Sequence, residues 1–304
     1  MFLSETGFAK PLLPPILDYM SITTKVLCID LGGTHCSSAL VDREEERVVE
    51  ESYFRCPVDS NGSRAQILRE IQEILHMTLS SNPSKPSKVI VSCPGPFDYE
   101  NGISRMDGMN KYQAILNFNL REFFADIIGI APESVCFYND AAAFLLGEVY
   151  FRKLEQKRII GLTLGTGLGS SIYVNGRIED LNYGSAPFQG GIVEDVISTR
   201  GMIGHLKEKF GRISVDNIKD LVQTSGLEEQ RRDAFDYLTA NLREFIKQYL
   251  APLAPDLIVI GGSIAKANSL FFEDLQSSLE QNLEVASFDE CNLFLGLTFE
   301  PLNI

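Results

Sequence analysis

Two stretches of the chain repeat one short unit, in which a hydrophobic strand is followed by a glycine turn and a second strand. Residues 26–42 and 159–175 align without a gap at a constant offset of 133 positions (163 − 30 = 133). Five of the seventeen aligned pairs are identical: Leu31/Leu164, Gly32/Gly165, Ser37/Ser170, Ser38/Ser171 and Val41/Val174. Such a repeat predicts a duplicated pair of domains whose glycine turns face each other across a cleft. Because such turns can hold a polyphosphate, nucleotide-dependent phosphoryl transfer is the leading hypothesis.

Size and charge narrow the classes of protein that fit. The chain has 304 residues, enough for about two domains, and its 44% apolar and 22% charged residues are typical of a soluble globular enzyme. A formal charge of −14 argues against nucleic acid as a partner and fits a cytoplasmic protein. No segment has the apolar length that a membrane span needs. Three prolines interrupt residues 1–24, which predicts a loosely ordered extension, and Met20 is an alternative start of translation.

The pattern of apolar residues predicts strands that alternate with helices. Strands are expected at 26–31, 36–41, 48–54, 88–93, 134–138, in the second repeat and at 257–262. Helices are expected at 63–79 after the cap residue Ser63, at 119–128, from Asn139 or Asp140 onward, through most of 192–249 and at 264–281. This order indicates the α/β class, with one lobe at 25–137 and a second at 138–304.

The first glycine turn follows a strand that ends in a carboxylate. Asp30 can hold Mg²⁺ through water, Gly32 and Gly33 allow a tight turn with exposed N–H groups, and Thr34 can donate to a phosphoryl oxygen. The turn is neither a Walker A loop nor a Rossmann fingerprint, because no lysine follows and the next element is a strand. An ordinary hairpin turn is an equal alternative.

The second glycine turn holds more glycine than a hairpin requires. Gly165, Gly167 and Gly169 surround Thr166, whereas a two-residue turn suffices to join two strands. The excess indicates that a ligand approaches the backbone closely, although a plain hairpin would also fit. Gly261 and Gly262 end a buried strand before a helix, where either a nucleotide or a tight strand-to-helix turn would explain them.

Asn139 and Asp140 stand where a strand passes into a helix. Asp140 can accept a proton from an attacking hydroxyl group, which is the role of a kinase catalytic aspartate. Asn and Asp are also preferred helix caps for purely local reasons, so capping competes with catalysis here. The three histidines and six cysteines show no metal-ligand spacing, and the cysteines are expected to be free thiols.

Six segments, in order, resemble the ROK family of bacterial sugar kinases within the actin, hexokinase and Hsp70 ATPase superfamily. They are DLGGT (30–34), CPGPFDYENGI (93–103), FYNDAAAFLLGE (137–148), LGTGLGSS (164–171), GGIVEDVISTR (190–200) and VIGGSIA (259–265). The resemblance implies two ribonuclease H-like lobes that close over ATP, Mg²⁺ and a hexose. Lobes of this kind often pair into homodimers, and the sequence leaves the oligomeric state open.

The resemblance also implies roles for single residues. The first turn (Asp30, Gly32, Gly33 and Thr34) would face the phosphates and metal, and the second (Gly165, Thr166, Gly167 and Gly169) the other side of the phosphate chain. Gly261 and Gly262 would lie near the adenosine. Asp140 would be the general base, with Asn139, Gly95 and Glu194 at the sugar. The implied reaction is transfer of the ATP γ-phosphoryl group to a hexose or amino-sugar hydroxyl, with the 6-hydroxyl as the expected acceptor.

The sugar-binding segment departs from the family pattern. Asn182 and Ser185 occupy the places of the usual Glu and His, so they are candidate sugar contacts of different chemistry. No cysteine lies between 137 and 290, so the zinc site of many members is not expected. These departures leave the sugar open and keep a catalytically inactive sugar-binding regulator as the alternative. A relative acting on acetate or polyphosphate fits less well, because Asn139, Asp140 and Glu194 are retained. The tail CNLFLGLTFEPLNI also departs from the usual closing helix.

Overall fold

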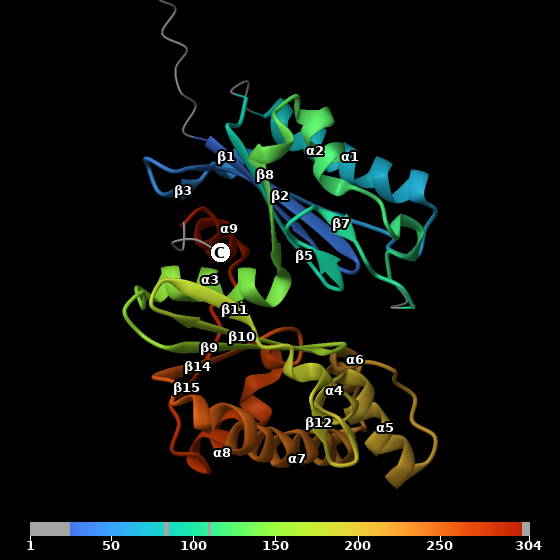
Figure 1. Cartoon of the computed structure of the whole chain (residues 1–304). Coiled ribbons are helices and arrows are strands. Elements are labelled where there is room, and N and C mark those ends of the chain that lie inside the picture. The colour runs from blue at the N-terminus through green and yellow to red at the C-terminus, as the bar shows by residue number, and fades with distance from the viewer. Residues whose placement is uncertain (1–24, 82–84, 109–110, 300–304) are drawn as a thin grey trace, which may run out of the picture.

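Two α/β lobes make up the computed structural model, which describes residues 25–81, 85–108 and 111–299 (Figure 1). The expected extension at 1–24 and the alternative start at Met20 lie outside the described residues. Two helices, α3 (Asp140–Arg152) and α9 (Glu290–Thr298), lie between the two sheets (Figure 1). In the described ranges, no helix is both long and apolar enough to cross a membrane.

The first lobe is built on a six-stranded sheet in the order β3–β2–β1–β5–β8, with β4 also paired to β2. Its strands are β1 (Lys25–Leu31), β2 (His35–Asp42), β3 (Arg47–Val48), β4 (Phe54–Pro57), β5 (Lys88–Cys93) and β8 (Val135–Asn139), and β6 (Phe97–Asp98) and β7 (Ile103–Ser104) form a separate hairpin. Helices α1 (Arg64–Ser80) and α2 (Leu120–Ile128) pack on one face. Ser63 caps α1 by accepting a hydrogen bond from Gln66 N–H (3.3 Å), as predicted.

The second lobe is built on a five-stranded sheet in the order β11–β10–β9–β14–β15. Its strands are β9 (Ile159–Leu164), β10 (Leu168–Val174), β11 (Arg177–Asp180), β14 (Leu257–Gly261) and β15 (Leu283–Val285), and β12 (Pro187–Phe188) and β13 (Gly191–Ile192) pair separately. Helix α3 covers one face. The other face carries α4 (Val193–Val196), α5 (Thr199–Phe210), α6 (Ile218–Gln223), α7 (Glu228–Phe245) and α8 (Phe272–Ser277).

The two helices between the lobes cross at glycines. A Cβ atom on Gly147 of α3 would lie 2.7 Å from the Cα atom of Leu293, and one on Gly296 would overlap the backbone of Gly147. Phe294 and Leu297 of α9 pack on the face of the first sheet that carries Val26 and Cys28. The end of the chain therefore covers the inner face of the first sheet.

The duplicated units differ by one residue in register. In the first unit Asp30 pairs with Ser37, whereas in the second the equivalent Thr163 pairs with Gly169 rather than with Ser170. The second turn is thus one residue tighter than the gapless alignment implied. Because side chains alternate along a strand, a slip of one residue moves them to the opposite face of the sheet.

Several expected elements are broken or added. The expected strand 48–54 is wrong over its middle, because Ser52 Oγ accepts from Leu40 N–H (2.8 Å) and donates to the Val49 carbonyl (2.6 Å) within a short helical turn. The expected long helical stretch is four helices, and the region 264–281 is a 3₁₀ segment followed by α8. The tail departs from the family pattern in sequence, and its residues up to Thr298 form helix α9 (Glu290–Thr298), whereas 300–304 lie outside the described residues.

Candidate active site

The first glycine turn is open on the side of the cleft. Gly32 N–H donates to the His35 carbonyl (2.9 Å), and Tyr112 Oη donates to the Gly32 carbonyl (2.6 Å). Gly33 and Thr34 are exposed, and a Cβ atom on Gly33 would meet no heavy atom of the described residues within 4 Å. The exposed part of this turn, at Gly33 and Thr34, therefore has room for a ligand.

Asp30, at the end of β1, is half-buried and accepts a hydrogen bond from Ser92 Oγ (2.7 Å). Burial raises the pKa of Asp30 to about 6, and the hydrogen bond from Ser92 opposes this shift. The charges of Glu290 and Asp140 raise the pKa further. The charge of Arg55 lowers the pKa of Asp30 but does not cancel these effects, and a bound divalent cation would lower it further.

Asp30 belongs to a row of polar residues that runs across neighbouring strands. Arg55 pairs with Ser37, Ser37 with Asp30, Asp30 with Ser92, and Ser92 with Tyr138. Directly paired residues point to the same face of a sheet, so these side chains share the face that α3 and α9 cover. The apolar inner face of the first sheet therefore ends in a polar strip at the cleft.

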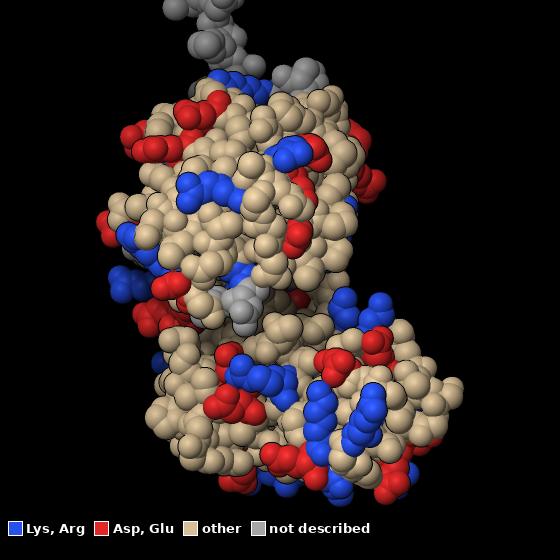
Figure 2. All heavy atoms as spheres, turned by 90° about the vertical axis from the view of Figure 1, so that its right-hand side faces the viewer, with Lys and Arg blue, Asp and Glu red and all other residues tan. Residues whose placement is uncertain are grey.

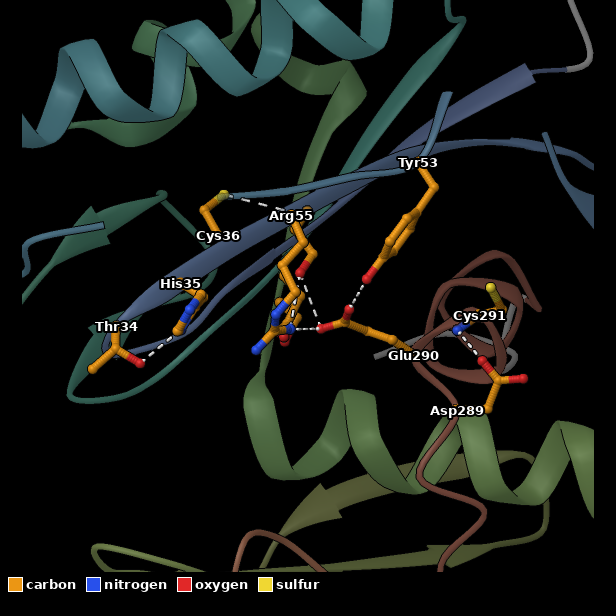
Figure 3. A network of polar contacts seen from close by, with 11 residues as sticks. Thr34, His35, Cys36, Tyr53, Arg55, Asp289, Glu290 and Cys291 are labelled. Atoms are coloured by element: carbon orange, nitrogen blue, oxygen red, sulfur yellow. Dashed lines mark hydrogen bonds and ion pairs between the residues drawn. The ribbon is translucent and has the colours of Figure 1, made fainter. Parts of the chain in front are cut away.

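The closing helix contributes a carboxylate to this strip (Figure 3). Glu290 accepts hydrogen bonds from Ser37 Oγ (3.0 Å), Tyr53 Oη (2.5 Å) and Arg55 Nη1 (2.5 Å). The pair of Arg55 and Glu290 is partly screened by solvent, since the Arg55 side chain is 47% exposed. These contacts tie the start of α9 to the strand next to Asp30.

Hydrogen bonds at the start of α3 show which side chain caps the helix. Asn139 Oδ1 accepts hydrogen bonds from Ala141 N–H (2.9 Å) and Ala142 N–H (3.3 Å), so Asn139 is the helix cap. Asp140 Oδ1 shares the Ala141 N–H (2.9 Å), and Asp140 Oδ2 has no hydrogen-bond partner among the described residues. One oxygen of Asp140 is therefore free to accept a proton.

The carboxyl group of Asp140 is accessible to solvent but is also surrounded by protein. Its side chain is exposed to solvent, yet the protein around the carboxyl group raises the pKa of Asp140 by taking water away from it. The charge of Lys111 opposes the shift, whereas Asp180 adds to it. A raised pKa makes a carboxylate a stronger base, which suits proton abstraction.

The second glycine turn is filled by other parts of the protein. A Cβ atom on Gly167 would lie 2.5 Å from Glu194 Oε2, and that oxygen accepts from Leu168 N–H (3.3 Å). A Cβ atom on Gly169 would overlap Thr163 Oγ1 and lie 2.9 Å from the Cβ atom of Ala141. Internal packing thus accounts for these two glycines, and Glu194, expected at the sugar, lies against the turn expected at the phosphates.

Gly261 and Gly262 lie beside the second turn, as their expected joint role requires. Gly262 has a φ of +88°, and a Cβ atom there would overlap the backbone of Leu164. A Cβ atom on Gly165 would lie 3.3 Å from Ser263 Oγ. Both glycine segments of the second lobe therefore meet at the ends of β9 and β14.

A cavity of about 400 Å³ opens next to Thr166. Its lining includes two basic side chains and the start of α5: Thr166, Thr199, Arg200, Ile203, Gly204, Lys207 and Asp216. Thr199 N–H donates to the Gly165 carbonyl (2.8 Å), which joins α5 to the turn. The volume lies in the range of small-molecule pockets. Figure 2 shows the hollow between the lobes on this side of the molecule.

The remaining predicted sugar contacts divide into two groups. Asn182 and Ser185 are exposed, and neither side chain makes a hydrogen bond to another described residue. Gly95 lies against the Asn139 side chain, because a Cβ atom on it would be 4.0 Å from Asn139 Nδ2 and 3.3 Å from Tyr99 Oη. Gly95 and Asn139 are therefore brought together near Asp140.

Sequence reasoning missed the residues that support this set. Ser92 could have been found, because it is the polar residue in the otherwise apolar stretch VIVSC (89–93). Tyr99 lies in the quoted segment CPGPFDYENGI but had no role assigned to it, and Arg55 and Glu290 lie in segments without a local signal. The contacts of all three join distant parts of the chain. Among the described residues, no three His, Cys, Asp or Glu side chains are grouped so as to hold a metal ion.

Comparisons with known proteins identify the family and the fold. The model of the ROK family matches residues 26–192. The glucokinase of Thermotoga maritima is 25% identical over 84% of this chain and 87% of its own length, and the N-acetylmannosamine kinase of Escherichia coli O6:H1 is 23% identical over 88% and 91%. A Streptomyces griseus ROK glucokinase structure, in complex with glucose and AMPPNP, superposes with a TM-score of 0.66 at 18% identity, covering 90% of this chain and 98% of that one. The match over more than half of its length shows that the chain belongs to the ROK family, with the two-lobe fold of the actin-like ATPases.

Proposed function

We propose that the protein is an ATP-dependent kinase that phosphorylates a hydroxyl group of a hexose or amino sugar, with the 6-hydroxyl as acceptor. The observation that carries the proposal is that Asn139 and Asp140 have different roles at the start of α3. Asn139 caps the helix, so Asp140 keeps an accessible oxygen with no hydrogen-bond partner among the described residues. A carboxylate confined to capping would be less free to take a proton.

The donor nucleotide is proposed to lie in the second lobe. The cavity beside Thr166 has the size for a nucleoside, and Arg200 and Lys207 line it. The open N–H groups of Gly33 and Thr34 would face the phosphates from the first lobe, and Asp30 would hold Mg²⁺ through water. When bound, Mg–ATP supplies the phosphoryl group and neutralises its charge.

The sugar is proposed to lie between Asn139, Glu194 and Gly95. Asp140 would accept the proton of the attacking hydroxyl group at Oδ2, while Asn139 would hold a neighbouring hydroxyl group. Positioning and charge stabilisation supply most of the acceleration in such transfers, because the enzyme makes no covalent bond itself. Glu194, which contacts Gly167 and Leu168, would connect the sugar to the phosphate end of the site.

Two further parts of the proposal concern its partners. Relatives named glucokinase and N-acetylmannosamine kinase support a hexose or amino sugar as substrate. The net charge of −14 supports a cytoplasmic protein that acts on a small molecule rather than on nucleic acid. A homodimer remains to be measured, for example by light scattering. An inactive sugar-binding regulator is the alternative, because Asn182 and Ser185 replace the usual Glu and His.

The experiment is a coupled ADP-release assay with Mg–ATP and a panel of sugars: glucose, mannose, N-acetylglucosamine, N-acetylmannosamine, fructose and allose. Asp140→Asn is the matched variant, because Asn139 keeps the cap and α3 should remain folded. We expect turnover on at least one sugar and a loss of about 10²–10⁴-fold in kcat for the variant. Sugar binding by calorimetry without turnover on any sugar would favour the regulator.

A further inference from the structure

A tyrosine within the segment CPGPFDYENGI, to which the sequence assigned no role, lies against the proposed sugar site. Tyr99 follows strand β6 and is half-buried, with its ring 5.2 Å from the ring of Phe97. Its hydroxyl group accepts a hydrogen bond from Asn139 Nδ2 (3.1 Å) and donates one to the Cys93 carbonyl (3.3 Å). Tyr99 therefore joins the end of β5 to the start of α3.

The contacts of Asn139 fix which way its amide points. Asn139 Oδ1 faces the N–H groups of Ala141 and Ala142, so a flipped amide would place NH₂ against two donors. One N–H of Nδ2 is directed to Tyr99 Oη. The second N–H of Nδ2 is then what Asn139 can offer to a ligand. Toward a sugar, Asn139 is a donor.

Burial keeps the hydroxyl group of Tyr99 protonated, as its two hydrogen bonds require. Loss of water around the ring raises the pKa of Tyr99, so its hydroxyl group stays protonated and can donate to Cys93 while accepting from Asn139. Gly95 leaves room for the pair, because a Cβ atom there would lie 3.3 Å from Tyr99 Oη. Three segments of the first lobe thus converge on one amide.

We infer that Tyr99 is a positioning residue for sugar recognition: it holds the Asn139 amide so that its free N–H donates to a sugar hydroxyl beside the one that is phosphorylated. The inference rests on the proposed function. Asn182 and Ser185, which replace the usual Glu and His, are exposed without side-chain hydrogen bonds to described residues. The side chain of Asn139, by contrast, is already held in place by Tyr99.

The test compares Tyr99→Phe with Tyr150→Phe in the full chain. Tyr150 also loses one hydrogen-bonded hydroxyl group, to Glu46 (3.1 Å), but lies toward the other end of α3. For the sugar that the wild type phosphorylates, Tyr99→Phe should raise KM by about 2–10-fold, the effect of one hydrogen bond, with KM for ATP unchanged. Tyr150→Phe should change neither constant.

Binding of monodeoxy derivatives of the same sugar separates a role in sugar recognition from a purely structural role, which would not change the penalty for one hydroxyl group. In the wild type, removal of the hydroxyl group that Asn139 holds should weaken binding, and in Tyr99→Phe that penalty should shrink at this one position. Equal penalties at every position in both proteins, or equal losses for sugar and ATP, would overturn the inference while leaving the kinase intact. Absence of sugar binding and turnover in the wild type would overturn the proposed function and the inference together.

Discussion

The two glycine turns share a sequence pattern and differ in what fills the space around them. The first turn is open: Gly33 and Thr34 are exposed, and Asp30 precedes them with a raised pKa. The second turn is packed: the space at Gly167 is taken by Glu194 and that at Gly169 by Thr163. The same glycine pattern therefore leaves open space in one lobe and is closely packed in the other.

The register shows how the copies diverged in structure. After the first turn Ser37 shares a face with Asp30 and donates to Glu290, whereas Ser170 points away from the Thr163 face and accepts from Tyr183 N–H (2.9 Å). Identical serines thus face opposite sides of their sheets. An identical residue in both copies of a repeat need not have the same surroundings, because a register shift of one residue moves its side chain to the opposite face of the sheet.

The largest expected effect is a difference in activity between substitutions at Asp30 and at its counterpart in the second repeat, Thr163. Asp30→Asn should lower kcat/KM at limiting Mg²⁺ by about 10–100-fold, since groups that hold a metal through water or orient its ligands have effects of this size. Thr163→Ser keeps the hydroxyl group at the equivalent position and should leave activity near that of the wild type. Steady-state kinetics over a range of Mg²⁺ concentrations would measure this, and equal losses in both variants would contradict the comparison.

The glycines should respond in opposite ways to alanine. Gly169→Ala forces a Cβ atom against Thr163 and Ala141, and overpacking of this kind destabilises by about 1–3 kcal/mol. Gly33→Ala should change stability by less than about 0.5 kcal/mol, because its Cβ atom would enter open space, yet it should weaken ATP binding. Thermal unfolding together with nucleotide titration separates the two outcomes; a similar loss of stability in both variants would show that the first turn is packed too.

A smaller effect concerns pH. The pKa of Asp30 is about 6 in the folded protein against 3.8 ordinarily, so the folded state holds this proton more tightly. Its stabilising contribution is present below pH 3.8 and is lost as the pH rises through about 6. Relative to the wild type, Asp30→Asn should therefore gain Tm between pH 4 and pH 6, by about 2–4 °C if roughly 1 kcal/mol is involved. A Tm difference that stays constant over this interval would refute the assignment.

The smallest effect tests the reversed serines. Ser37→Ala removes the hydroxyl group that Glu290 and Arg55 share, and Ser170→Ala removes the acceptor for Tyr183 N–H. Each should destabilise by about 0.5–1.5 kcal/mol, as for one ordinary hydrogen bond. When each variant is combined with Glu290→Gln, the losses of stability should be non-additive with Ser37→Ala and additive with Ser170→Ala, because only Ser37 contacts Glu290. Double-mutant thermal denaturation gives the answer, and coupling with Ser170→Ala would be the contrary result.

Sequence patterns predicted much of this fold, because strands and helix caps depend largely on residues that are close together in the sequence. The runs that became β1, β2, β9 and β10 were found at nearly the right bounds, and Ser63 caps α1 as expected. The sequence could not show that Ser52 would break an expected strand, since the cause is its bond to Leu40. Nor could it place Glu290 beside Ser37, a contact that spans 253 positions. Contacts of this kind join segments that are far apart in the chain, so no local pattern in the sequence predicts them.

Helix α9 also has a consequence for the order in which the molecule is made. It covers the inner face of the first sheet with Phe294 and Leu297, so that face stays uncovered until residues 290–298 have been synthesised. Domains usually fold as units while the chain emerges from the ribosome, and an uncovered apolar face is prone to aggregate. During translation the second lobe can close its own core first, and the first lobe is completed only when α9 leaves the ribosome.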